Sequence, residues 1–223
     1  MHKYIVATTK EWHIKIFKKK HAFENWSLVS SPDELTLEKI SELNPRYIFF
    51  PHWSWIVPEE ITNNFECVCF HSSDVPYGRG GSPIQNLIIR GHKETKISAL
   101  KMVNELDAGP VYLKRDLNLA GCAQEIFEKS AIIISDMMDW IAANEPNPVP
   151  QEGLPVVFKR RTSNENIMPT SGSLTDIYNH IRMLDVESYP DSHIEYGDFI
   201  INFSGANLNK NSIEARVKIV RKP

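Results

Sequence analysis

Residues 69–83, CFHSSDVPYGRGGSP, end an apolar run on a histidine and then pass through a glycine-rich turn into a helix-like pattern. The run at 65–70 is the last of four, after those at 4–9, 26–29 and 47–50, and helix-length segments separate them. Strands that alternate with helices predict an α/β fold with a mostly parallel sheet and helices on both faces. In such sheets ligands bind beyond the carboxyl ends of the strands, and His71 stands at one of these ends.

Length and composition limit the classes of protein that the chain can belong to. Its 223 residues, 42% of them hydrophobic, suffice for one substantial core with a small appendage, and we expect a domain at 1–190 and a β extension at 191–223. No run approaches the roughly 18 apolar residues of a membrane span, and the N-terminus lacks a signal-peptide layout. Three cysteines favour a reduced compartment, so we expect a cytoplasmic protein. A net charge of −3 gives no general attraction to nucleic acid.

Two sequence patterns predict where helices begin. Ser31-Pro-Asp-Glu34 is a capping box and opens a predicted helix whose inner face comprises Leu35, Leu37, Ile40 and Leu43. Ser82-Pro-Ile-Gln85 is a second capping box and begins a predicted helix that ends near residue 90. The glycine turn therefore delivers the chain into a helix.

The glycine turn resembles a phosphate loop only superficially. Gly78-Arg-Gly-Gly81 matches neither the Walker spacing nor G-x-G-x-x-G after a first strand. The remaining alternatives are a turn that only reverses the chain and a turn that walls a site.

Cys67, Cys69 and His71 alternate and would share one face of a strand. This arrangement raises zinc or a Cys/His nucleophile as hypotheses, but no Cys-x-x-Cys or His-x-x-x-His accompanies it. Buried cysteine is also a common core residue. We therefore expect no metal.

A carboxylate is predicted near His71. Residues 94–103 are predicted as a strand, 104–110 as a tight loop and 111–114 as a returning strand. Asp107 on that loop is expected at the same rim of the sheet as His71. An aspartate in such a place can also serve only to cap the turn.

Together these segments resemble the folate-dependent formyltransferases, a Rossmann-like family that contains glycinamide ribonucleotide, methionyl-tRNA and amino-sugar N-formyltransferases. The resemblance covers about residues 45–145 and the His-to-Asp separation of 36 positions looks like the family's. It rests on residues 71–76 (HSSDVP), Arg79, Gly80, 83–85 (PIQ), Gly91, Thr95, Met102 and 107–111 (DAGPV).

The resemblance implies direct transfer of a formyl group from 10-formyltetrahydrofolate to a substrate amine. His71 would stabilise the negative oxygen of the tetrahedral intermediate, and Asp107 would favour the charged imidazole or relay a proton. The family's pattern has an asparagine where this chain has Cys69, and a thiol is a poor hydrogen-bond donor. Gln85 and Asn86 are candidates to replace the missing amide.

The family's folate pocket implies a place for the donor in this chain. Trp55, Ile56 and Val57 follow the third strand and would form one wall of a pterin slot. Val103, Asn104 and Asp107 would lie opposite. Tryptophans after a strand are otherwise ordinary core residues.

The acceptor is predicted from the tail of the chain. Residues 158–162, FKRRT, and a capped helix from Ser173 resemble the sugar-nucleotide formyltransferases, and residues 194–220 alternate like a β-hairpin. We therefore expect a nucleotide-linked amino sugar as substrate, a role in surface-glycan biosynthesis, and neither nucleic acid nor membrane as partner. Purine-type formyltransferases, a non-catalytic binding module and a homodimer stay open. The predicted substrate-binding residues are Arg79, Gly80, Gln85, Arg160, Arg161 and Arg182.

Overall fold

The structure is a computed structural model and describes residues 3–23, 25–187 and 189–222. The chain divides into two compact units. The first comprises Met1–Gly80, Lys96–Leu117 and Glu128–Val157, and the second Gly81–Thr95, Asn118–Phe127 and Phe158–Pro223. No helix among the described residues is long and apolar enough to cross a membrane.

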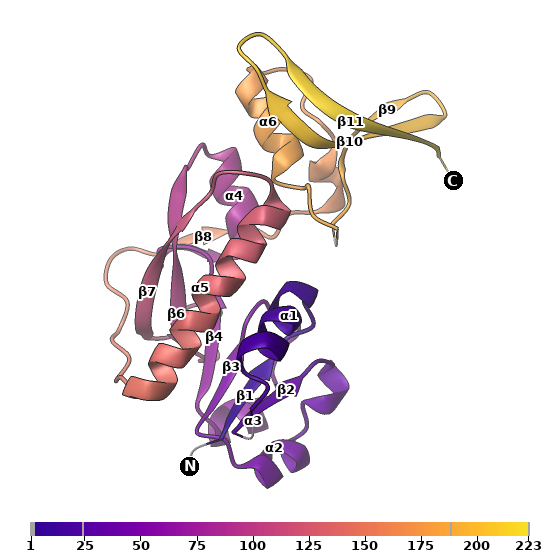
Figure 1. Cartoon of the computed structure of the whole chain (residues 1–223). Helices are drawn as coiled ribbons and strands as arrows, with labels where there is room; N and C mark the ends of the chain where they lie inside the picture. Colours follow the sequence, from indigo (N-terminus) through magenta and orange to yellow (C-terminus); the bar gives the residue numbers. More distant parts are fainter. Residues whose placement is uncertain (1–2, 24, 188, 223) are drawn as a thin grey trace. The chain divides into compact units, whose positions relative to one another are not determined.

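A six-stranded sheet forms the centre of the first unit, in the order β2-β1-β3-β4-β6-β7 (Figure 1). The first four strands in this order are parallel, and β6 runs antiparallel to β4, with His71 opposite Ser98. The predicted mostly parallel sheet is confirmed. The strands are β1 (Tyr4–Ala7), β2 (Trp26–Val29), β3 (Tyr47–Phe50), β4 (Cys67–His71), β6 (Glu94–Lys101) and β7 (Val111–Asn118).

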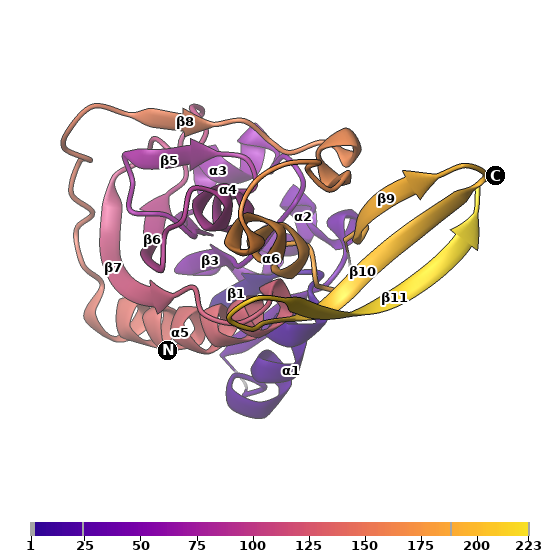
Figure 2. The same ribbon diagram turned by 90° about the horizontal axis from the view of Figure 1, so that it is seen from above.

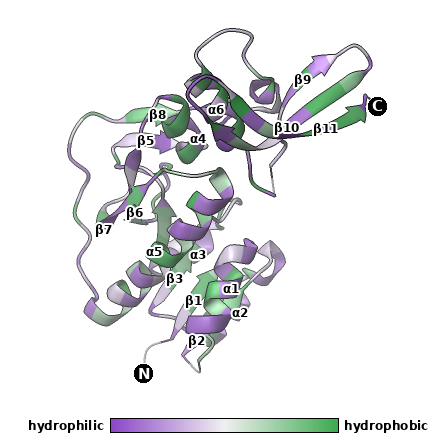
Figure 3. Cartoon of the chain, turned by 45° about the horizontal axis from the view of Figure 1, so that its top comes forward, coloured by the Kyte–Doolittle hydropathy of each residue, from purple (hydrophilic) through white to green (hydrophobic). Residues whose placement is uncertain are grey.

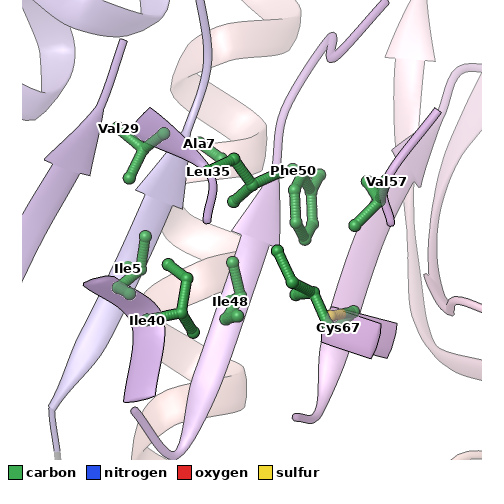
Figure 4. Close-up of a cluster of buried hydrophobic side chains, with 10 residues drawn as sticks. Ile5, Ala7, Val29, Leu35, Ile40, Ile48, Phe50, Val57 and Cys67 are labelled. Atoms are coloured by element: carbon green, nitrogen blue, oxygen red, sulfur yellow. The ribbon is translucent and has the colours of Figure 1, made fainter. Parts of the chain in front are cut away.

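Helices cover both faces of this sheet, as expected. On one face, α2 (Leu37–Leu43) and α3 (Glu59–Asn64) accompany a buried apolar cluster that includes Ile48, Phe50 and Cys67 (Figure 4). On the other face lie α1 (Glu11–Lys20) and α5 (Ala123–Asn144), and the Tyr4 hydroxyl donates to the Ala142 carbonyl of α5 at 3.2 Å. Most of the ribbon of β1 and β3 is hydrophobic (Figure 3), as expected for strands that are buried on both faces.

The capping box at Ser31 is confirmed, whereas the one at Ser82 is wrong. Ser31 does cap a turn with Glu34, but this turn is a short 3-10 helix, η1 (Pro32–Glu34), and Thr36 caps α2 separately. Ser82 has a φ of 50° and its side chain caps nothing; its Oγ instead accepts from the Arg161 amide at 3.2 Å. The helix that follows, α4 (Pro83–Ile89), begins with proline as predicted.

The second unit contains α4, α6 (Leu174–Arg182) and a three-stranded antiparallel sheet in the order β11-β10-β9 (Figure 2). The predicted C-terminal hairpin is therefore joined by a further strand, and the division expected at residue 190 stays a prediction. The strands are β9 (Ser192–Tyr196), β10 (Phe199–Leu208) and β11 (Ile213–Arg221). The remaining elements are β5 (Tyr77–Gly80) and β8 (Val156–Phe158), which pair as a two-stranded sheet, and the 3-10 helix η2 (Ser163–Asn166).

Candidate active site

His71 is the last residue of β4, and its ring is fixed from one side. Its Nε2 lies 2.7 Å from the carbonyl oxygen of Gly78, which also accepts from the Ser73 hydroxyl at 3.1 Å. A carbonyl oxygen can only accept, so Nε2 carries the proton. The other ring nitrogen, Nδ1, lies 3.4 Å from Oδ2 of Asp107. Nδ1 is therefore the atom whose protonation can change during a reaction.

Asp107 reaches His71 by a route that differs from the predicted one. Because β6 is antiparallel to β4, its last residues lie beside the start of β4, where the Met102 amide donates to the Cys67 carbonyl at 2.9 Å. The loop that follows β6 then returns toward the end of β4. Asp107 has a φ of 55°, a left-handed conformation that aspartate tolerates better than most residues, and its Oδ2 accepts from the Gly80 amide at 2.9 Å.

This geometry suits proton transfer and stabilisation of charge. The distance from Nδ1 to Asp107 exceeds the roughly 2.7–2.9 Å of a strong charge-assisted hydrogen bond. A bound substrate group can therefore compete for Nδ1. When neutral, His71 presents a lone pair at Nδ1, and when protonated it presents a donor beside a carboxylate.

Cys69 precedes His71 by two residues on the same face of β4, where the family's pattern has asparagine. Burial, and secondarily the Asp107 carboxylate, raises the pKa of its thiol to about 12. The thiol is therefore protonated at neutral pH, whereas cysteine nucleophiles act as thiolates. This environment favours direct transfer over a covalent thioester.

Two loops that flank β4 contain the residues predicted for the folate slot. Trp55, Ile56 and Val103 are exposed apolar side chains, and Asn104 is exposed, whereas Val57 is buried in the core cluster. Trp53 was not predicted; its ring lies 5.3 Å from that of Trp55, and its buried indole N–H has no acceptor within residues 3–23, 25–187 and 189–222. Trp53, Cys69 and Met102 pack against the same cluster, which brings the two loops to one face of the sheet.

These loops fit a pterin. Exposed aromatic and aliphatic side chains together with an unsatisfied buried donor are the mixture typical of small-molecule pockets. Trp55, Ile56 and Val103 would form the apolar walls, and the indole N–H of Trp53 is a donor without a partner among the described residues.

The predicted substrate arginine of the first unit has partners within the protein. Arg79 donates from Nε and Nη2 to Oε1 of Gln151 and from Nη1 to Glu105. The amide of Gly80 is likewise engaged, with Asp107. Gln151 was missed by the sequence analysis because nothing in its proline-rich neighbourhood marks it.

The other predicted substrate residues lie in the second unit and are mostly engaged there. Arg182 is buried and donates to the carbonyls of Leu119 and Gly121, so it stabilises the turn before α5. Arg161 donates to the carbonyl of Glu165. The two remaining substrate residues are Gln85, which is buried, and Arg160, which is exposed. Asn86, predicted with Gln85 as a replacement for the missing amide, donates instead to three backbone carbonyls.

A histidine pair, with His13 buried and His52 half-buried, lies at the carboxyl end of β3 and was also missed. His13 Nε2 lies 2.7 Å from His52 Nδ1, so one ring donates and the other accepts. Burial lowers the pKa of both rings, and for His52 to about 4, with the charges of Lys10 and His71 adding to the effect. The pair is therefore neutral at physiological pH.

Known proteins resemble this chain over most of its length. A solved structure of a methionyl-tRNA formyltransferase from Clostridium thermocellum is 46% identical, with a TM-score of 0.94, and the match covers 99% of this chain and 100% of that one. A curated methionyl-tRNA formyltransferase from Sulfurihydrogenibium is 28% identical over 80% of this chain and 60% of its own length. The chain thus spans about three fifths of that relative. A 4-N formyltransferase from Francisella tularensis, 14% identical with a TM-score of 0.66 over 86% of this chain and 92% of its own, shares the fold.

These relatives show that the predicted acceptor is wrong. The expected nucleotide-linked amino sugar, the role in surface-glycan biosynthesis and the exclusion of nucleic acid conflict with relatives that are named methionyl-tRNA formyltransferases. The tail that suggested a sugar enzyme matches a family model described as "Methionyl-tRNA formyltransferase, C-terminal domain" at residues 163–220. A mildly acidic net charge was an insufficient reason to exclude RNA.

A second family model, described as "Formyl transferase", matches residues 4–123. This range contains the whole of β4 with His71, the loop of Asp107 and the exposed residues after β3. It covers more than half of the chain, and the fold agrees with that of the C. thermocellum structure. The chain belongs to the formyl transferase family.

Proposed function

We propose that the protein is an N-formyltransferase that uses 10-formyltetrahydrofolate, with the α-amino group of methionyl-tRNA as the acceptor. The observation that carries the proposal is the His71 ring, whose Nε2 faces the Gly78 carbonyl while its Nδ1 faces Asp107. The formyl transferase family uses 10-formyltetrahydrofolate as its donor. The cytoplasmic location expected from the sequence stays a prediction.

The residues of the site have distinct tasks in this proposal. When bound, 10-formyltetrahydrofolate supplies the electrophilic formyl carbon. His71 accepts the proton of the attacking amine at Nδ1, and Asp107 stabilises the imidazolium that results. The protonated Nδ1 then serves as the donor to a developing negative oxygen and as the source of a proton for the departing nitrogen. Cys69, protonated and buried, forms no covalent bond with the formyl group.

The acceptor is inferred from the relatives rather than from the site. Methionyl-tRNA is named for the C. thermocellum structure, for the curated relatives and for the C-terminal family that matches residues 163–220. The net charge of −3 is compatible with RNA, because local clusters of cations govern phosphate contacts. One such cluster is the last turn of α1, which contains Lys18, Lys19 and Lys20, the last of which also pairs with Asp136 and Asp139.

The test is formyl transfer by the purified chain. Wild-type protein with 10-formyltetrahydrofolate and methionyl-tRNA is expected to yield N-formylmethionyl-tRNA, measured by acid gel or by mass after deacylation. Free methionine at the same concentration is expected to react far more slowly, and the His71→Ala variant serves as the inactive control. Efficient transfer to another amine but not to methionyl-tRNA would disprove the acceptor and leave the chemistry standing.

A further inference from the structure

Gln151 connects Arg79 with the loop that carries Asp107. Its Nε2 donates to the carbonyls of Asp107 and Gly109, at 2.8 Å each. Its Oε1 accepts from Nε and Nη2 of Arg79, at 3.0 and 2.9 Å. A guanidinium can only donate, so Arg79 forces the oxygen of the amide toward itself and both N–H groups toward the loop.

The Lys101 amide closes the base of the loop by donating to the Pro110 carbonyl at 2.9 Å, so the loop needs support at its tip. Asp107 is in the left-handed region, with a φ of 55°, and the nearest hydrogen bond within the loop, from Ala108 to Glu105, is long at 3.3 Å. The outer partner of Arg79, Glu105, has a side chain that is 77% exposed, and such surface pairs contribute little. The amide of Gln151 is therefore the main side-chain support of the loop among the described residues.

The segment that carries Gln151 is itself anchored. Val149 and Val111 exchange backbone hydrogen bonds of 2.7 and 2.9 Å, which fix the segment against the start of β7. Figure 2 shows the chain between α5 and β8 passing β7. Gln151 therefore fixes the loop that carries Asp107 relative to β7.

We propose that Gln151, oriented by Arg79, is a positioning residue that holds the Asp107 carboxylate against His71 Nδ1 and the Gly80 amide. Its effect on turnover rests on the proposed function. Its effect on the place of the carboxylate does not, because the Gly80 amide reports that place directly through its 2.9 Å hydrogen bond.

Gln151→Glu is the sharpest variant because it keeps an acceptor for Arg79 and removes both donors to the loop. In a 15N-labelled protein we expect the Gly80 amide proton to move upfield, toward its position in Asp107→Ala. Turnover is expected to fall by about 10- to 100-fold with little change in KM for the folate donor, since small misplacements of catalytic groups cost rates of this order. In the Asp107→Ala background, Gln151→Glu is expected to cause no further loss.

Two controls separate this role from charge and from general stability. Asn147→Asp adds the same negative charge to the same segment at an exposed side chain, and Glu105→Gln removes the charge of the outer partner of Arg79. Both are expected to leave the Gly80 resonance and turnover near wild type. If Gln151→Glu fails to fold, Gln151→Asn, which has the same amide on a shorter side chain, is measured instead.

Three results would overturn the proposal. They are an unmoved Gly80 resonance in the folded variant, an equal shift in Asn147→Asp, and additive losses of turnover with Asp107→Ala. A wild-type protein without formyl transfer would refute the proposed function alone, because the resonance of Gly80 requires no substrate.

Discussion

Replacing Asp107 with asparagine removes one charge from the site and changes little else. The Gly80 amide donates to Asp107 at 2.9 Å, and the side-chain oxygen of an asparagine can still accept this hydrogen bond. What is lost is the attraction between the carboxylate and a protonated His71. Asp107→Asn therefore isolates the electrostatic part of the proposed mechanism.

The separation and the burial of the pair set the size of this effect. At the observed 3.4 Å, Coulomb's law with an effective dielectric constant of about 20 gives about 5 kcal/mol as an upper value. The two side chains are only 8% and 11% exposed, so water screens the pair little. Allowing for solvent and relaxation, we expect a loss of about 2 to 4 kcal/mol in transition-state stabilisation, or about 30- to 1000-fold in kcat/KM.

The assay is steady-state formyl transfer by wild type, Asp107→Asn, His71→Ala and the double variant, with circular dichroism to verify folding. Because the two residues act as one unit, the double variant is expected to lose much less than the sum of the single losses. Additive losses, or near-normal turnover in Asp107→Asn, would refute the reasoning.

Three further predictions test the surroundings of the site. Cys69→Ala is expected to keep turnover within about threefold, since a thiol with a pKa raised to about 12 is no nucleophile at neutral pH; loss of turnover together with a trapped formyl thioester would contradict this. Gly109→Ala is expected to lower the free energy of unfolding, measured in urea, by about 2 to 3 kcal/mol, because the added Cβ would lie 1.8 Å from the Lys101 carbonyl oxygen. An unchanged midpoint of the urea unfolding curve would show that the loop adapts. For His52, burial lowers the pKa from 6.5 to about 4. The neutral ring therefore contributes its full stability above pH 6.5, and up to about 3 kcal/mol of the free energy of unfolding is lost as pH falls toward 4. His52→Asn, which suits the φ of 50°, is expected to flatten the fall in unfolding free energy between pH 7 and 4.5, and an equally steep fall in this variant would reject the assignment.

The strands and the position of His71 were predictable because their signals are local. The runs at 26–29 and 47–50 became β2 and β3 without a shift of boundary, and His71 ends β4 as expected. A short, mostly apolar run is typical of a buried strand or a buried helix. Its length of about four residues favours the strand.

The contacts that hold the site are long-range and left no local signal. Gln151 reaches a carbonyl 44 positions away, and Ser82 departs from its capping pattern because the Arg161 amide, 79 positions away, donates to its hydroxyl. The antiparallel direction of β6 likewise depends on pairing that periodicity does not encode. The acceptor was mispredicted for a related reason, since a short basic run in the tail and the net charge do not determine which amine a site receives.

The most direct test of the account is a single turnover with protein in excess over 10-formyltetrahydrofolate and methionyl-tRNA. We predict that tetrahydrofolate and N-formylmethionyl-tRNA appear in equal amounts and at the same rate, that no formyl group remains on the protein by mass spectrometry, and that His71→Ala abolishes both products. Release of tetrahydrofolate without any formylated amine, or transfer that persists in a folded His71→Ala protein, would contradict the central claim.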